Sequence, residues 1–354
     1  MDDTSGIVVT GGAGFIGSAL VRALVASGAR VTTVDKLGYA GSLSNLAAVE
    51  GQAHHRFVKA DVADGAAMAR VFAEARPRIV FHLAAESHVD RTIDGPMDAV
   101  ASNVTGTAIL LEAARAHWLA LDEAGRAAFR IVHVSTDEVF GSLGSGGRFD
   151  ETSPHRPNSP YAATKAASDH LARAWHATYG LPVMTVNATN TYGPHQHPEK
   201  LIPHMVLRAL AGEALPVYGE GSQVRDWLHV EDHVAVLRAV AARGRAGARY
   251  AVGARSERRN IDVVRAICAT LDEAIPTGRP HARLIAFVAD RPAHDARYAI
   301  DPSRTEAELG WRARVAFENG LAETVLWYVA RRDAWSGYDR ARLGLGRTEN
   351  ARAP

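Results

Sequence analysis

The chain has 354 residues, of which 47% are hydrophobic and 22% charged, and its formal net charge is +1 at pH 7. These values are ordinary for a globular enzyme, and so small a net charge favours neither nucleic acid nor an acidic membrane surface as a partner. Cys268 is the one cysteine, no apolar run is long enough to span a membrane, and residues 1–6 lack the basic and apolar regions of a signal peptide, so we expect a cytoplasmic protein without disulfides.

A glycine-rich loop follows the first predicted strand, Ile7–Thr10, and begins a helix that extends to about Ala26. Its glycines permit a tight turn and bring backbone N–H groups close to a pyrophosphate at the helix N-terminus. In this strand–loop–helix context the pattern favours a dinucleotide site over a loop without a ligand. The glycines concerned are Gly11, Gly14 and Gly17.

The second predicted strand, Val31–Val34, ends at Asp35, about 20 residues past the glycines. A carboxylate in this place accepts hydrogen bonds from both ribose hydroxyls of NAD and repels the 2′-phosphate of NADP. Lys36 opposes this choice because a cation could neutralise that phosphate. We give Asp35 more weight, since its direction is fixed by the strand whereas the long Lys36 side chain can point to solvent. The sequence therefore predicts bound NAD.

Strands and helices then alternate along the chain. Small residues, Ala84 and Ala85, follow the fourth predicted strand and would let a cofactor lie close. Repeated strand–helix units predict an α/β fold, a Rossmann-type doubly wound parallel sheet with right-handed crossovers. Predicted strands cover residues 57–60, 79–83 and 183–188, with a further strand from Ile131, and predicted helices cover residues 66–75, 97–117 and 160–179.

Two adjacent carboxylates stand at the end of the strand that begins at Ile131. Thr136, Asp137 and Glu138 would lie at the carboxyl edge of the sheet, where open α/β sheets bind their ligands. Two such carboxylates can serve as an acid and a base if their surroundings separate their pKa values. The alternative is a pair of solvated loop acids, since charged side chains are mostly exposed.

Tyr161 and Lys165 are the next candidates. Pro160 begins a helix, and the spacing of four residues places the phenol and the ammonium group on one face. We expect the lysine charge to lower the pKa of Tyr161, which would make the phenolate a base for a substrate hydroxyl. This spacing is common by chance in helices. Its position after a strand and a glycine-rich N-terminal motif makes it a specific indication of a catalytic pair.

The composition of the sequence changes after Asn190, where a turn-rich and aromatic segment leaves the predicted sheet. We interpret the remainder as a smaller, partly interleaved substrate lobe. The predicted division is a Rossmann domain over residues 1–190, to which segments of about 226–265 return, a substrate lobe over 191–335 and a flexible tail over 336–354. Within the second part we expect helices near 201–212, 232–242 and 262–271 and strands near 249–252 and 284–287.

Five motifs together resemble the dTDP-glucose 4,6-dehydratase family, within the extended short-chain dehydrogenase/reductase superfamily. The resemblance extends from Thr10 to about Tyr328, and in this family the Thr-Asp-Glu run is the mark of the dehydratases. Related sugar epimerases and decarboxylases lack the Asp-Glu pair. The motifs occupy residues 84–91, 135–141, 198–203, 225–227 and 289–292.

The resemblance implies a hydro-lyase of deoxysugar biosynthesis that converts dTDP-glucose to dTDP-4-keto-6-deoxyglucose, with NAD carrying hydride from C4 to C6. Tyr161, helped by Thr136 and Lys165, would take the 4-hydroxyl proton. Glu138 would then take the proton on C5, which the C4 ketone makes acidic, and a protonated Asp137 would donate to the departing 6-hydroxyl. The resemblance also implies a homodimer, in which the helices over 97–117 and 160–179 pair with their copies.

The resemblance assigns further contacts residue by residue, and none of them is a metal ligand. Arginines suit a diphosphate because the guanidinium donates in a fixed fork, although an isolated arginine would more often be an ordinary surface residue. The implied cofactor contacts add Phe15, Ile16, Lys36, Asp61, Val62, Leu83, Ala84, Ala85 and Ser102. The implied substrate contacts are Ser87, Thr136, Asn190, Glu199, Lys200, Leu201, Pro216, Tyr218, Arg225, Asn260, Asp290, Arg291 and His294.

Two other functions stay open at this point. One is a dehydratase or 4-epimerase acting on another nucleotide sugar such as a UDP-sugar, because Thr191 and Ala293 depart from the family pattern. Asp137 argues against the epimerase, since epimerisation needs no acid at C6. The other is a catalytically silent NAD-binding scaffold, which would typically lack Tyr161 or Lys165.

Overall fold

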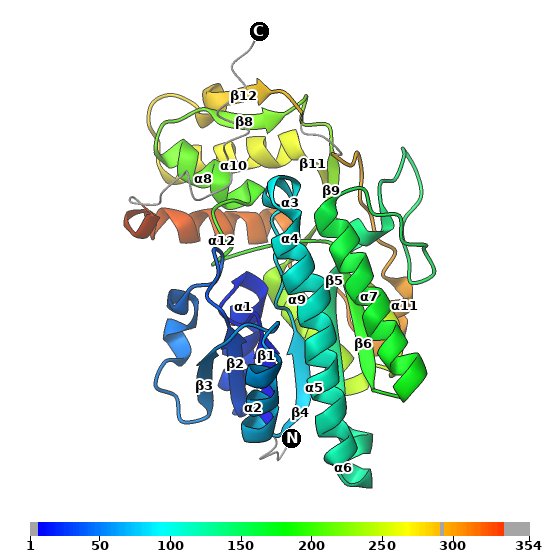
Figure 1. Cartoon of the computed structure of the whole chain (residues 1–354). Coiled ribbons are helices and arrows are strands. Elements are labelled where there is room, and N and C mark those ends of the chain that lie inside the picture. The colour runs from blue at the N-terminus through cyan, green and yellow to red at the C-terminus, as the bar shows by residue number, and fades with distance from the viewer. Residues whose placement is uncertain (1–5, 291–293, 336–354) are drawn as a thin grey trace.

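Seven parallel strands form the central sheet of the protein (Figure 1). The structure, a computed structural model, describes residues 6–290 and 294–335. The strand order is β3-β2-β1-β4-β5-β6-β10, so the direction of winding reverses between β1 and β4. The predicted doubly wound α/β fold is therefore confirmed. The strands are β1 (Gly6–Thr10), β2 (Val31–Asp35), β3 (His55–Lys59), β4 (Pro77–His82), β5 (Arg130–Thr136), β6 (Val183–Ala188) and β10 (Arg249–Val252).

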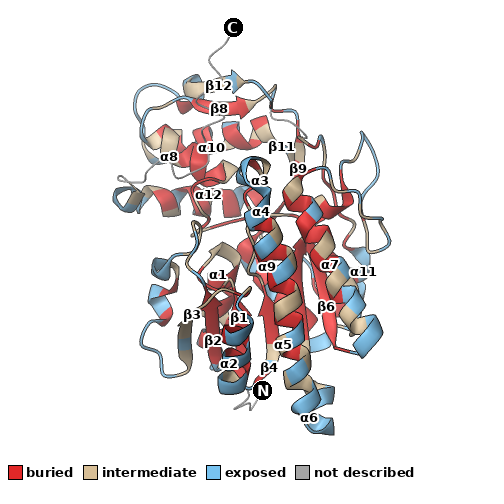
Figure 2. Ribbon diagram, viewed as in Figure 1, coloured by how far each residue is buried: buried red, intermediate tan, exposed pale blue. Residues whose placement is uncertain are grey.

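Helices cover both faces of this sheet, and the strands between them are largely buried (Figure 2). On one face α1 packs against α9, and on the other α5 packs against both α2 and α7. A separate apolar cluster fills the space under each of these layers. The bounds are α1 (Phe15–Ala26), α2 (Gly65–Ala75), α5 (Gly106–Ala120), α7 (Pro160–Tyr179) and α9 (Val230–Arg243).

A π-helical segment interrupts the helix that was predicted over residues 97–117. The chain runs from α4 (Pro96–Ala99) through η2 (Val100–Thr105), which is π-helical, into α5. Such segments are rare and often lie at functional sites. Here the Asn103 amide donates to the backbone oxygen of Glu86 at 3.0 Å and accepts from its backbone nitrogen at 2.8 Å. The segment therefore anchors the loop that follows β4.

A second, smaller lobe lies beyond the carboxyl ends of the large sheet, at the top of Figure 1. Its three main helices, α8 (Leu201–Leu210), α10 (Asn260–Ala274) and α12 (Phe317–Val329), pack around their own apolar cluster. One small sheet has the order β11-β9-β7, and β12 pairs with β8 in another. Their bounds are β7 (Asn190–Tyr192), β8 (Leu215–Tyr218), β9 (Val224–His229), β11 (Glu257–Arg259) and β12 (Ile285–Val288).

The chain crosses between the two parts more than once. After β9, α9 packs on α1 and β10 pairs with β6, so both belong to the large sheet. From Asn260 the chain is back in the small lobe, because α10 packs against α8 and α12. The division into domains at residue 190 stays a prediction.

The remaining helices are short: α3 (Val89–Asp94), α6 (Glu123–Ala128), α11 (Ser303–Leu309) and the 3-10 turns η1 (Leu43–Val49), η3 (Asp137–Phe140), η4 (His281–Leu284) and η5 (Arg332–Trp335). Among residues 6–290 and 294–335, no helix is both long and apolar enough to cross a membrane. The tail predicted over residues 336–354 lies outside the described residues.

Candidate functional site

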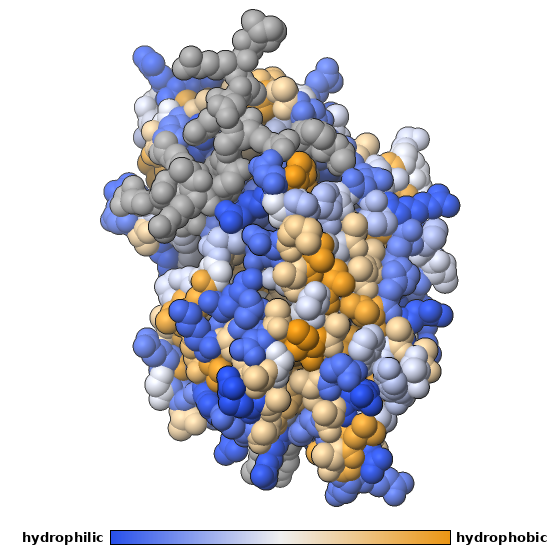
Figure 3. Space-filling view, in the orientation of Figure 1, coloured by the Kyte–Doolittle hydropathy of each residue, from blue (hydrophilic) through white to orange (hydrophobic). Residues whose placement is uncertain are grey.

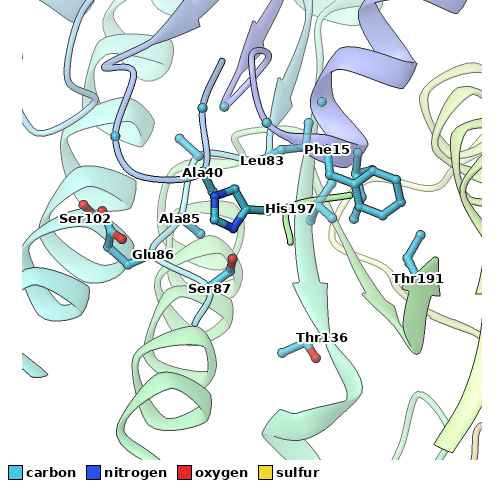
Figure 4. A pocket seen from close by; sticks show the side chains of 18 of the residues that line it. Phe15, Ala40, Leu83, Ala85, Glu86, Ser87, Ser102, Thr136, Thr191 and His197 are labelled. Carbon is cyan, nitrogen blue, oxygen red and sulfur yellow. The ribbon is translucent and has the colours of Figure 1, made fainter. Parts of the chain in front are cut away.

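A cavity of about 300 Å³ lies at the carboxyl ends of the central strands (Figure 4). It collects the predicted catalytic residues and the predicted cofactor residues from seven separate parts of the chain. In Figure 4, Phe15 and Thr191 lie on one side of it, Glu86 and Ser102 on the other, and Thr136 below. The predicted catalytic and cofactor residues that line it are Gly11, Gly14, Phe15, Ile16, Gly17, Asp35, Lys36, Asp61, Val62, Leu83, Ala84, Ala85, Ser102, Thr136, Asp137, Glu138, Tyr161 and Lys165.

The glycine-rich loop is packed too tightly to carry side chains. A Cβ atom on Gly11 would lie 2.6 Å from the backbone nitrogen of Ala84, and its φ of +68° favours glycine as well. A Cβ atom on Gly17 would overlap the carbonyl oxygen of Gly11. Gly14, the N-cap of α1, brings no side chain to the first turn. Backbone N–H groups there are thus open to an anion such as a diphosphate.

Asp35 is held in place at the end of β2. Its Oδ2 accepts a hydrogen bond from the backbone nitrogen of Ala13 at 3.0 Å, and its Oδ1 accepts one from Leu37 at 2.8 Å. Burial raises the pKa of this carboxyl above its ordinary value. Because each oxygen keeps a second lone pair, the fixed carboxylate remains able to accept from ribose hydroxyls.

The Lys36 side chain is 37% exposed, but its ammonium group is held by neighbouring side chains. Its Nζ donates to Ser102 Oγ at 2.7 Å and lies 3.1 Å from a carboxylate oxygen of Glu86 and 3.7 Å from one of Asp61. The carboxylates of Glu86 and Asp61 account for this geometry, and of these two only Asp61 was predicted at the cofactor site. They also balance the charge of Lys36, which weakens its case as a partner for a 2′-phosphate.

The three residues at the end of β5 form a compact unit. Thr136 Oγ1 accepts from the backbone nitrogen of Glu138 and donates to Asp137 Oδ1, each at 3.3 Å. Asp137 is buried, so the alternative of a solvated loop acid is wrong for it. Burial, followed by the charge of Glu138, raises the pKa of Asp137 to about 7. A substantial fraction of this carboxyl is therefore protonated near neutral pH, as a proton donor requires.

Tyr161 and Lys165 lie in the first two turns of α7, which begins with Pro160 as predicted. Lys165 Nζ donates to the carbonyl oxygen of Val134 at 2.8 Å, and burial lowers its pKa to about 8. Burial, followed by the charge of Glu138, raises the pKa of Tyr161 well above its ordinary value. The predicted lowering of the pKa of Tyr161 is therefore wrong, because burial and nearby carboxylates act in the opposite direction.

The predicted substrate residues divide into two groups. Ser87, Asn190, Glu199 and Lys200 line the same cavity as the catalytic residues. Lys200 Nζ donates to the carbonyl oxygen of Ser87 at 2.8 Å, which links the small lobe to the loop after β4. Leu201, Pro216, Tyr218, Arg225, Asn260, Asp290 and His294 are not among the lining residues, and Arg291 and Ala293 lie outside the described residues.

Part of the second group gathers in the small lobe. The Tyr218 and His294 rings lie 5.8 Å apart, His294 Nδ1 is 2.6 Å from Asp290 Oδ1, and Gln223 donates to Asp290 Oδ2 at 2.8 Å. Arg225 is buried and donates to two backbone carbonyl oxygens, so its guanidinium is already engaged within the lobe. The roles of these residues in substrate binding stay predictions.

Several lining residues were not predicted from the sequence: Tyr39, Glu86, Gln196, His197 and His233. Thr191, noted above as a departure from the family pattern, also lines the cavity. The His197 ring lies near the centre of Figure 4, among the other labelled lining residues. Its aromatic, turn-rich segment was a usable signal, whereas His233 on α9 gave none, because a histidine inside a helix is usually part of the core. Thr191 Oγ1 lies 2.8 Å from His233 Nδ1. Within the described ranges, no cluster of three or more potential metal ligands is found.

The family model described as GDP-mannose 4,6 dehydratase matches residues 8–324. The chain belongs to this family. The dTDP-glucose 4,6-dehydratase of Xanthomonas campestris pv. campestris (strain B100) is 57% identical over 91% of this chain and 92% of its own length. The resemblance stated from the sequence motifs is therefore confirmed.

Solved structures of dehydratases agree with the fold as well. The dTDP-glucose 4,6-dehydratase DesIV of Streptomyces venezuelae with NAD bound has a TM-score of 0.85 and 44% identity, and covers 94% of this chain and 99% of its own. A double mutant of the same enzyme, also with NAD bound, has a TM-score of 0.86 and 43% identity, and covers 93% of this chain and 98% of its own.

Proposed function

We propose that the protein catalyses the NAD-dependent dehydration of dTDP-glucose to dTDP-4-keto-6-deoxyglucose. The observation that carries this proposal is the buried Asp137, with its pKa raised to about 7, next to Glu138 in the cavity that also holds Tyr161 and Lys165. A proton donor and a second carboxylate at one place are what elimination of water needs. The dTDP-glucose 4,6-dehydratases named above support the choice of substrate.

The residues at the carboxyl ends of β1 and β2 fit a dinucleotide. The packed glycine loop leaves room only for backbone near the diphosphate, and the fixed Asp35 carboxylate suits two ribose hydroxyls. When bound there, NAD would supply the hydride acceptor for C4 and the hydride donor for C6, together with a positive charge that favours the phenolate of Tyr161.

The chain's own residues then move three protons. Tyr161 takes the proton of the 4-hydroxyl, and Lys165, fixed by the Val134 carbonyl, supplies a positive charge from the same helix face. Glu138 takes the proton from C5 once C4 is a ketone, and later returns it. Asp137 gives its proton to the 6-hydroxyl, which leaves as water. A 4-epimerase would have no use for a buried acid in the place of Asp137.

The decisive experiment uses the purified protein with dTDP-glucose and without added NAD. We expect a 4-keto sugar, detected by its absorbance in alkali, while UDP-glucose gives a slower reaction. Faster turnover of UDP-glucose would assign the enzyme to UDP-sugars. A 4-epimerised sugar with no loss of water would overturn the proposal, and so would binding of dTDP-glucose without any product.

The cofactor is expected to stay with the protein through purification, because it is regenerated within each cycle. Release of the nucleotide in mid-cycle would strand an oxidised sugar. Asp35 is positioned for NAD, and Lys36 is balanced by Glu86 and Asp61, so we expect NAD rather than NADP. Denaturation followed by mass spectrometry identifies the released nucleotide. Recovery of NADP would contradict this assignment, and stoichiometric consumption of added NAD would contradict the internal return of hydride.

We further propose that the protein is a C2 homodimer, the commonest oligomer. Apolar residues gather on one face of the molecule over α4, α5 and α7 (Figure 3), and Met97, Leu119 and Tyr179 are exposed on these helices. Light scattering at micromolar concentration should give twice the monomer mass. Met97→Arg should weaken the dimer, while Leu326→Arg, an exposed leucine on α12, should leave it intact. A monomeric native protein would contradict this proposal.

A further inference from the structure

Asp169 is a buried carboxylate for which the mechanism above has no use. It lies on α7, one turn after Lys165, and its side chain is almost wholly inaccessible. Its Oδ1 is 3.2 Å from His133 Nε2, and its Oδ2 accepts a hydrogen bond from Asn187 Nδ2 at 2.9 Å. A charge buried in this way is costly unless it is paired and hydrogen-bonded.

Asn187 connects this carboxylate to the catalytic strand. It lies on β6, opposite Ser135 of β5, and its amide nitrogen also donates to the carbonyl oxygen of Thr136 at 3.1 Å. Both partners of the nitrogen, a carboxylate and a carbonyl, can only accept hydrogen bonds. The amide nitrogen of Asn187, and not its oxygen, must therefore face them. Asparagine is disfavoured in strands, which suggests that this position is occupied for its two donors.

We propose that Asp169 is a positioning residue for the dehydration. Through Asn187 it holds the carbonyl of Thr136, and thereby sets the direction in which Asp137 and Glu138 leave the sheet. Thr136 is the last residue of β5, and the two carboxylates follow it directly in η3. A displacement of about 1 Å in such a group can slow a reaction about 100-fold. This inference rests on the proposed function.

The charge of Asp169 strengthens this arrangement. Burial raises the pKa of Asp169, but the hydrogen bonds from His133 and Asn187 and the charge of Lys165 outweigh burial, so that the pKa lies below its ordinary value. Asp169 is therefore an anion at neutral pH. Hydrogen bonds to a charged acceptor are stronger than those between neutral groups, so an ionised Asp169 holds the Asn187 amide more firmly than a neutral side chain would.

The test compares Asp169→Asn, Asn187→Ala and the double variant in the dTDP-glucose assay. Asp169→Asn keeps the shape and removes the charge, and Asn187→Ala removes the link to Thr136. We expect each to lower kcat about 10-fold to 100-fold with little change in KM, and to prolong the transient of reduced nicotinamide, since elimination is slowed. The double variant should be no slower than Asn187→Ala, because both changes act through one contact.

Ser168→Ala is the matched control. It removes a buried hydroxyl of the same network. This hydroxyl lies 3.1 Å from His133 Nε2 and has no part in the link to Thr136. We expect its kcat to match the native value. Circular dichroism identifies the variants that remain folded. If either Asp169→Asn or Asn187→Ala does not fold, the kcat of the other variant tests the proposal.

Native kcat in either folded variant would overturn the positioning role, and so would losses that multiply in the double variant. A rise in KM with unchanged kcat would indicate a role in binding instead. Absence of dehydration by the native protein is a different result, because it would overturn the proposed function itself.

Discussion

Asp137→Asn is expected to oxidise C4 of dTDP-glucose at nearly the native rate and to eliminate water about 10²–10⁴-fold more slowly. Asparagine has the shape of aspartic acid but cannot give up a proton to the leaving 6-hydroxyl. Reduced nicotinamide should therefore accumulate in a single turnover without the 4-keto-6-deoxy product. Rapid-quench sampling and absorbance, followed on the same time scale, measure the two species.

The same variant is expected to change the pH dependence of elimination. Burial raises the pKa of Asp137 to about 7, and only the protonated form donates, so the native rate of elimination should fall as the pH rises through about 7. Asp137→Asn should lack this fall. Asp122→Asn is the matched control, because this exposed residue caps α6 and asparagine caps helices equally well. Near-native product formation by Asp137→Asn would remove Asp137 from its assigned role.

Tyr161→Phe is expected to stop the reaction at an earlier step. Loss of the phenol removes the group that takes the 4-hydroxyl proton, so oxidation of C4 should slow about 10²–10⁴-fold. In contrast to Asp137→Asn, no reduced nicotinamide should accumulate. Stopped-flow absorbance in a single turnover measures this directly.

Tyr179→Phe provides a control at the opposite end of the same helix, outside the cavity, where only a hydroxyl is lost. It should behave as the native protein. Binding of dTDP-glucose by calorimetry shows whether Tyr161→Phe still takes up substrate. A transient of reduced nicotinamide at the native rate in Tyr161→Phe would show that another group takes the first proton.

The large sheet was largely predictable from the sequence, because buried parallel strands are rich in β-branched residues and alternate with helices. α7, β6 and β10 begin and end at the predicted residues. The very short strands β7 and β11 were not predicted, since three residues carry too little pattern. The π-helical segment around Ser102 was also missed, because the helix was predicted as one uninterrupted element over residues 97–117.

The candidate site was predictable as a set of residues but not as an electrostatic environment. A motif can place Tyr161 and Lys165 on one helix face, yet the pKa of Tyr161 depends on burial and on Glu138, which belongs to another element. For the same reason the partners of Lys36 come from the loop after β4, from the loop after β3 and from the π-helical segment. The contribution of the small lobe was least predictable, since Arg225 uses its donors internally.

The interleaved path of the chain determines when the sheet can be completed during translation. The final strand, β10, ends at Val252, although β6 has already ended at Ala188. At about 5–20 residues per second, a ribosome needs roughly 3–13 s to add the intervening segment. During this interval the edge of β6 and the face of α1 that α9 will cover remain open to chaperones and proteases. A premature stop codon before Val252 would release a polypeptide that cannot complete its nucleotide-binding sheet, because β10 would be truncated or missing.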